Sequence, residues 1–154
     1  MRWDQGRAEI EALIGDHRLQ RVPASREHAD RLIRHARAHL GSAAALATTD
    51  PEGSYALLYD GARKALTAVL ENEGLRPTSA GGHLAVYDAA RAQLDPPLGS
   101  TLRPFDRMRR QRRDAEYPAA DAPALSPDDV RDDIAKSEAI VALAERVLDQ
   151  MSPY

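Results

Sequence analysis

Apolar residues recur at intervals of three and four along most of the chain, and this spacing constrains the fold more than any other feature of the sequence. Such intervals place side chains on one face of an α-helix, whereas a half-buried strand requires strict alternation. Five or six segments have the helical spacing, and no alternating segment is long enough to be a convincing strand. The sequence therefore predicts an all-α protein, an up-and-down bundle of five or six helices without a sheet.

Turn and capping residues divide the chain into these segments. We expect helices at about 4–19, 26–49, 55–74, 82–94, 105–117 and 127–151. Ser25 and Ser126 are good N-caps, and Gly74 is suited to close the third helix. We interpret Pro51-Glu52-Gly53 as a turn between the second and third helices. The broad apolar face of the third segment predicts a central helix. The broad apolar stripe of the last segment predicts that this helix has neighbours on two sides, one of which could be a second subunit.

Length and composition predict one domain that covers residues 1–154. The chain contains no cysteine, which excludes disulfides, thiolate metal sites and a cysteine nucleophile. Its start, Met1-Arg2-Trp3-Asp4, lacks the apolar stretch of a signal peptide. No segment approaches the ~20 apolar residues of a membrane span. We therefore expect a cytoplasmic protein that does not interact with a membrane.

Positive charge is concentrated in one segment of a mildly acidic chain. The net charge is -3, yet six arginines stand against one acid, Asp106, between residues 103 and 113. Within that segment Phe105, Met108 and Arg112 fall at i, i+3 and i+7, on one helical face. Arg112 therefore points toward the core, where a guanidinium needs a partner or a function, and Glu116 is the nearest candidate partner. Alternatively, the segment is short and exposed, and its arginines solvate one face.

Other candidate chemistry is sparse. His35 and His39 have the i, i+4 spacing that can chelate a metal, and His28 lies on the same helix edge, but no further ligand is placed by the sequence. We predict neither a metal nor a cofactor. Gly81-Gly82 lacks the lysine and spacing of a phosphate-binding loop, and no serine motif has a placed base. His83 lies on the apolar arc of its predicted helix, either as a satisfied core histidine or as a site residue.

Four short motifs occur along the predicted helices: YDGARKAL at 59–66, GLRP at 74–77, GGH at 81–83 and RRDAEYP at 112–118. Together with the order of the elements they resemble HEPN-domain proteins, over roughly residues 26–151. That resemblance implies a small helical bundle that is usually dimeric. In active members an arginine, a polar residue and a nearby histidine from two protomers form a metal-independent endoribonuclease site. Many such proteins are toxins of toxin-antitoxin pairs or belong to phage defence.

The resemblance gives Arg112 the role of the family's arginine and Arg113 that of its polar neighbour. Tyr117 stands five residues after Arg112, where an active member has histidine. Tyrosine titrates near 10 and is a poor general base at neutral pH, although branches of the family do end this motif in Glu-Tyr. Catalysis would then involve Arg112, Glu116 and Tyr117.

These residues lead to two hypotheses. In the first, a HEPN-like homodimer engages RNA or a nucleotide in a cleft between protomers, with Arg109, Arg113 and His83 as nucleic-acid contacts and an antitoxin or nucleotidyltransferase as a possible partner. Arginine would stabilise the charge of the reacting phosphate. In the second, the chain is a non-catalytic binding or dimerisation module, and Arg112 and Glu116 form a structural ion pair.

Overall fold

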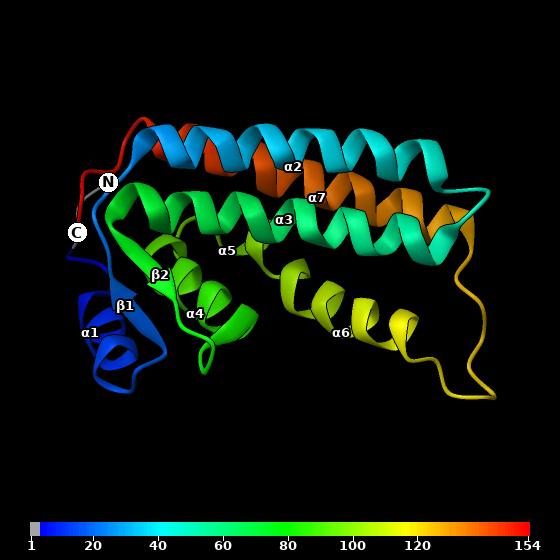
Figure 1. Ribbon diagram of the computed structural model, residues 1–154, viewed down its shortest axis with the longest axis horizontal. Helices are drawn as coiled ribbons and strands as arrows, with labels where there is room; N and C mark the ends of the chain where they lie inside the picture. The colour runs from blue at the N-terminus through cyan, green and yellow to red at the C-terminus, as the bar shows by residue number, and fades with distance from the viewer. Residues whose placement is uncertain (1–3) are drawn as a thin grey trace.

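The computed structural model describes residues 4–154 and consists mainly of helices (Figure 1). Met1, Arg2 and Trp3, which contributed to the expected absence of a signal peptide, lie outside the described residues. The elements follow in the order α1 (Arg7–Gly15), β1 (Leu19–Arg21), α2 (Arg26–Leu46), α3 (Pro51–Glu73), β2 (Leu75–Pro77), α4 (Gly82–Leu94), α5 (Gly99–Leu102), α6 (Pro104–Glu116) and α7 (Pro127–Leu148). The prediction of an all-α helical fold is confirmed.

The three longest helices, α2, α3 and α7, lie lengthwise beside one another (Figure 1). Along the bundle α2 and α6 run in one direction and α3 and α7 in the other, which is the up-and-down arrangement. α3 contacts α2, α4, α6 and α7, so the prediction of a central helix from its broad apolar face is confirmed. No helix within residues 4–154 is both long and apolar enough to cross a membrane.

The wide apolar stripe of α7 is covered within the same chain. α7 packs against both α3 and α2, and its residues Val130, Ile140 and Val147 are buried. A stripe that contacts two helices must be wider than one that contacts a single neighbour. Its width therefore requires no second subunit, and the homodimer stays a prediction that rests on the resemblance.

One feature corrects the prediction of a bundle without a sheet. β1 and β2 form an antiparallel pair in which Leu19 lies opposite Pro77 and Arg21 opposite Leu75. Each strand has three residues, too few to show an alternating pattern in the sequence. The first helix is correspondingly shorter than predicted. It ends at Gly15 because the chain turns at His17, which has a φ of 58°, before Leu19 enters the sheet.

The start of α3 also differs from the prediction. We interpreted Pro51-Glu52-Gly53 as a turn, but α3 begins at Pro51. The side chain of Asp50 accepts a hydrogen bond from the backbone N–H of Gly53 at 3.0 Å, which caps the helix. Pro51 occupies the first turn, where its missing N–H costs no hydrogen bond. These residues therefore start a helix and leave only a short connection after α2.

α6 needs a polar anchor because only two of its side chains, Phe105 and Met108, are buried. The anchor is Asp133 on α7, which is 5% exposed. Arg107 of α6 donates to both oxygens of Asp133, at 2.6 and 3.0 Å, and the hydroxyl of Tyr55 on α3 donates to it at 2.7 Å. Burial alone would raise the pKa of Asp133, but these hydrogen bonds hold it below its ordinary value. The carboxylate therefore joins three helices.

We predict that Asp133→Ala lowers the free energy of unfolding by about 3 kcal/mol, because it leaves the Tyr55 hydroxyl buried without a partner and releases Arg107. Asp132→Ala is the matched control, since Asp132 is exposed on the same helix turn. Urea denaturation of both variants measures the difference. Equal midpoints for the two variants would show that the anchor does not stabilise the fold.

The last turn of α3 contains a buried acid. Glu73 is 1% exposed, and one of its oxygens accepts a hydrogen bond from Nε2 of Gln93 at 3.2 Å. The other carboxyl oxygen of Glu73, and Oε1 of Gln93, have no hydrogen-bond partner within residues 4–154. Burial raises the pKa of Glu73 well above its ordinary value. Folding therefore favours the protonated form of this carboxyl group.

The pKa of Glu73 is higher in the folded protein than in the unfolded chain, where it is near 4.5. The contribution of Glu73 to stability is therefore complete below the unfolded pKa and is lost as the pH rises through the folded pKa. We expect Glu73→Gln, whose amide stays neutral and can donate to Gln93, to stabilise the protein at pH 8 by about 1 kcal/mol, or roughly 2–4 °C in Tm. At pH 5 the gain should shrink. Thermal melting at both pH values measures it, and a gain that does not depend on pH would contradict a protonated Glu73.

Candidate functional site

The arginines of α6 meet the first turn of α4 at a pocket. Arg109, Arg112 and Arg113 stand at i, i+3 and i+4, so they share one face of α6. The pocket has a volume of about 330 Å³ and is lined by Tyr59, Gly81, His83, Leu84, Arg109, Arg112 and Arg113. We call it the arginine pocket. It brings together four residues that the sequence singles out, because α3 places α4 and α6 side by side.

The position of His83 depends on the loop between β2 and α4. The backbone N–H of Thr78 donates to the carbonyl of Arg18 at 3.0 Å, and the N–H of Gly81 donates to the Thr78 hydroxyl at 3.1 Å. A Cβ atom at Gly81 would collide with the carbonyl oxygen of Arg18, so only glycine allows this approach. Contacts of Arg18, just before β1, with the loop that follows β2 thus position the start of α4.

Tyr59 on α3 forms the inner wall of the arginine pocket and holds His83. Tyr59 is fully buried, and its hydroxyl lies 3.0 Å from Nδ1 of His83. Burial raises the pKa of Tyr59, so its phenol stays protonated and can donate to Nδ1. Burial and the positive charges of Arg63 and Arg112 lower the pKa of His83. His83 is therefore neutral at pH 7, and when Tyr59 donates to its Nδ1 the ring proton lies on Nε2.

Arg112 faces inward, as its spacing predicts, but lies at the edge of the core. Its guanidinium lies over the ring of Tyr59, 5.9 Å from the centre, and its side chain is 28% exposed. Nη1 is 3.0 Å from a carboxylate oxygen of Glu116, so the predicted partner is confirmed. Nε is buried and has no hydrogen-bond partner among the described residues. Arg112 thus lines the pocket with the exposed part of its side chain, while its Nε is closed off from solvent.

Two of the residues expected to act with Arg112 lie outside the arginine pocket. Glu116 is ion-paired to Arg112 one turn further along α6 and does not line the pocket. Tyr117 follows the end of α6 and is 79% exposed. Within a single chain, therefore, Glu116 contacts Arg112 but Tyr117 does not join the other candidate residues.

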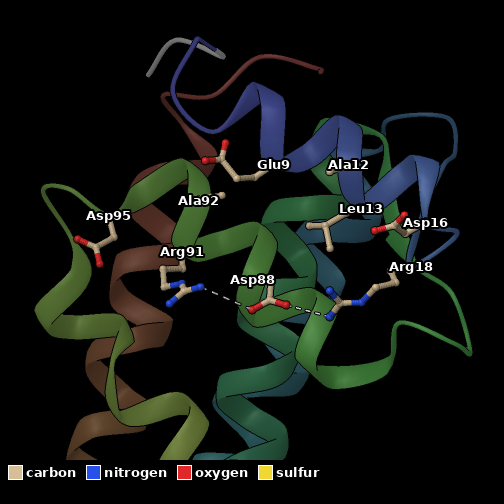
Figure 2. A pocket seen from close by; sticks show the side chains of 9 residues that line it. All are labelled: Glu9, Ala12, Leu13, Asp16, Arg18, Asp88, Arg91, Ala92 and Asp95. Carbon is tan, nitrogen blue, oxygen red and sulfur yellow. Dashed lines mark hydrogen bonds and ion pairs between the residues drawn. The ribbon is translucent and has the colours of Figure 1, made fainter.

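A second, larger pocket has the opposite electrostatic character (Figure 2). It lies between α1 and α4 and has a volume of about 550 Å³. Arg18 and Arg91 are both directed toward Asp88 on its wall, at 2.8 and 4.0 Å, and its other carboxyl groups belong to Glu9, Asp16 and Asp95. Four acids against two paired arginines disfavour an anion. None of the residues singled out by the sequence lies there.

The histidines of α2 do not assemble with further ligands. Nε2 of His39 lies 2.6 Å from the ammonium nitrogen of Lys64, and Nε2 of His28 lies 3.9 Å from a carboxylate oxygen of Glu71. Burial and the neighbouring Lys64 lower the pKa of His39. No cluster of three or more histidine, aspartate or glutamate side chains suited to a metal ion occurs within residues 4–154. The chelating pair His35 and His39 thus has no third ligand there.

Comparison of the chain with protein-family models, with curated proteins and with solved structures finds no match. The candidate site therefore has to be interpreted from its own residues. Sequence reasoning missed Tyr59 as a site residue, since it is one apolar position among many on α3. The signal was its place within the YDGARKAL motif, four residues before Arg63.

Proposed function

We propose that this chain is a HEPN-like protein that binds RNA, or a nucleotide, through its phosphate groups at the arginine pocket. The observation that supports this proposal is the meeting of Arg109, Arg112 and Arg113 with His83 in one pocket. Guanidinium groups and a neutral imidazole N–H are donors suited to phosphate oxygens. α4 begins at the wall of the same pocket without a side-chain cap, so its positive end adds to the attraction for an anion.

The biological setting follows from the resemblance to HEPN-domain proteins. It supports a homodimer, a place in a toxin-antitoxin or defence system, and an antitoxin or nucleotidyltransferase as partner. The cytoplasm is the compartment in which such a protein would meet RNA. These parts of the proposal rest on the four short motifs and the order of the elements.

Endoribonuclease activity is the further step that the resemblance suggests. In that step the 2′-hydroxyl would attack the adjacent phosphorus while Arg112 stabilises the added negative charge. Glu116 is already bound to Arg112, and Tyr117 is exposed and does not line the arginine pocket. Neither residue is well placed to move the proton at pH 7, so we expect the site to bind RNA better than it cleaves it.

The alternative is a binding or dimerisation module in which Arg112 serves only the ion pair with Glu116. The 3.0 Å contact favours this alternative, but Glu116 is 40% exposed and the pair joins neighbouring turns of one helix. Such i, i+4 pairs contribute about 0.3–0.5 kcal/mol. Breaking a buried ion pair would lower the free energy of unfolding by about 3 kcal/mol, and we do not expect such a loss for this pair. The ion pair with Glu116 therefore stabilises the fold too little to explain an inward-facing arginine at position 112.

We predict that Arg112→Ala weakens binding of a single-stranded RNA pool about tenfold or more and makes the affinity less dependent on salt, because one phosphate contact is lost. Arg110→Ala is the matched control. It removes the same charge from α6, but the side chain of Arg110 is 58% exposed and does not line the pocket. Fluorescence anisotropy at three salt concentrations measures both. Thermal melting should show a loss below about 1 kcal/mol for each variant. Equal RNA affinities for the two variants would contradict the proposal.

A second prediction separates the pocket from the exposed tyrosine. Tyr117→Phe should leave RNA affinity unchanged, since Tyr117 does not line the arginine pocket, whereas His83→Ala should weaken binding because it removes a donor from it. The same binding assay measures both, and a cleavage time course near pH 7 measures any hydrolysis. Fast cleavage that is lost in Tyr117→Phe would instead place the reactive centre at Tyr117.

A further inference from the structure

We propose that the arginine pocket selects a terminal phosphomonoester, such as the 5′-phosphate of an RNA end, over an internal phosphodiester, and that His83 takes up a proton when this group binds. This inference rests on the proposed function, because it names the kind of phosphate that the same pocket takes.

Burial and the surrounding charges explain why His83 is neutral when the pocket is empty. The charges that act on it are those of Arg63 and Asp60 on α3 and of Arg112 and Arg109 on α6. Together with burial, the arginines outweigh the single carboxylate and lower the pKa of His83. At pH 7 the imidazole therefore contributes a hydrogen-bond donor but no charge.

A bound dianion reverses these conditions. Two negative charges close to Arg112 and His83 offset the repulsion from the arginines and favour the imidazolium form. Tyr59 permits the change, since its hydroxyl can donate to Nδ1 of neutral His83 or accept from Nδ1–H of the cation. A proton from solvent forms an N–H bond at Nδ1 of His83, no bond to phosphorus forms or breaks, and the complex holds one more cationic group than the free pocket.

The donors also match a terminal group. Arg112 lines the pocket from α6 with a side chain that is 28% exposed, and His83, whose Nδ1 contacts Tyr59, lines it from α4. A monoester presents three terminal oxygens and enters end-on, so donors from α6 and α4 can contact it from both sides. An internal diester has only two such oxygens and one negative charge, and its chain must leave the pocket in two directions. The second negative charge of the monoester is the one that favours proton uptake at His83.

The experiment compares two fluorescent RNA pentanucleotides of one sequence at pH 7.0, one with a 5′-phosphate and one with a 5′-hydroxyl. We expect the 5′-phosphate to bind roughly tenfold more tightly, because one additional half-buried ion pair is equivalent to about one pKa unit. His83→Gln, which keeps a donor but cannot become charged, should remove most of this preference. His35→Gln, at an exposed histidine of α2, is the matched control and should retain it.

A second measurement tests the proton directly. Titration of the His83 ring by NMR, with and without inorganic phosphate, should show that phosphate raises its pKa, and calorimetry in two buffers should show proton uptake that His83→Gln abolishes. If both oligonucleotides bind equally and Arg112→Ala weakens both, the preference for a terminal phosphate is wrong and the proposed function stands. If neither oligonucleotide binds to the wild-type protein, the proposed function fails as well. A preference that persists in His83→Gln would show that the arginines alone produce it and would overturn the role of His83.

Discussion

The buried carboxylate of Asp133 is the interaction on which the arrangement of the candidate site depends. α6 has too few apolar side chains to hold itself against the bundle, and Arg107 bound to both oxygens of Asp133 supplies the missing attachment. Tyr55 donates to the same carboxylate, so the contact joins α6 to α7 and to the central helix α3. A charged group this deeply buried is costly unless each of its oxygens is satisfied, and here three hydrogen bonds satisfy them. The attachment sets how α6 lies along α3.

The same helix separates arginines with a structural role from arginines that remain available. Arg107 is committed to Asp133, and Arg110 points to solvent near Asp106. Arg112 contacts Glu116 and lies over Tyr59, yet its partly exposed side chain still lines the arginine pocket. Because α6 is anchored, these donors are held in place before any ligand arrives, which lowers the entropy lost on binding. Tyr59 likewise holds His83 in place, because its buried hydroxyl contacts Nδ1 of the imidazole and leaves Nε2 available to a ligand.

Particular residues show how far sequence reasoning reached. The positions of Phe105 and Met108 located the buried face of α6, and with it the inward orientation of Arg112 and the ion pair to Glu116, because contacts within one helix follow from its period. The strands at Leu19 and Leu75 were missed, since a three-residue pair is defined by its long-range partner and not by its own pattern. Asp50 was missed as a cap because a proline-glycine sequence is also typical of a turn. The group of Arg109, Arg112 and Arg113 was predictable as one helix face, whereas Tyr59 was not predictable as its neighbour.

The sequence by itself determined the all-helical class, the central place of α3 and the charged face of α6, because all three depend on intervals of a few residues along one helix. Only the tertiary structure decided that His83, far from Arg112 in the chain, shares its pocket, and that Tyr117, five residues from Arg112, does not. Such meetings depend on how helices pack, and packing is decided by the summed burial of many side chains. It is also decided by a few buried polar contacts such as that of Asp133, which no short stretch of sequence contains.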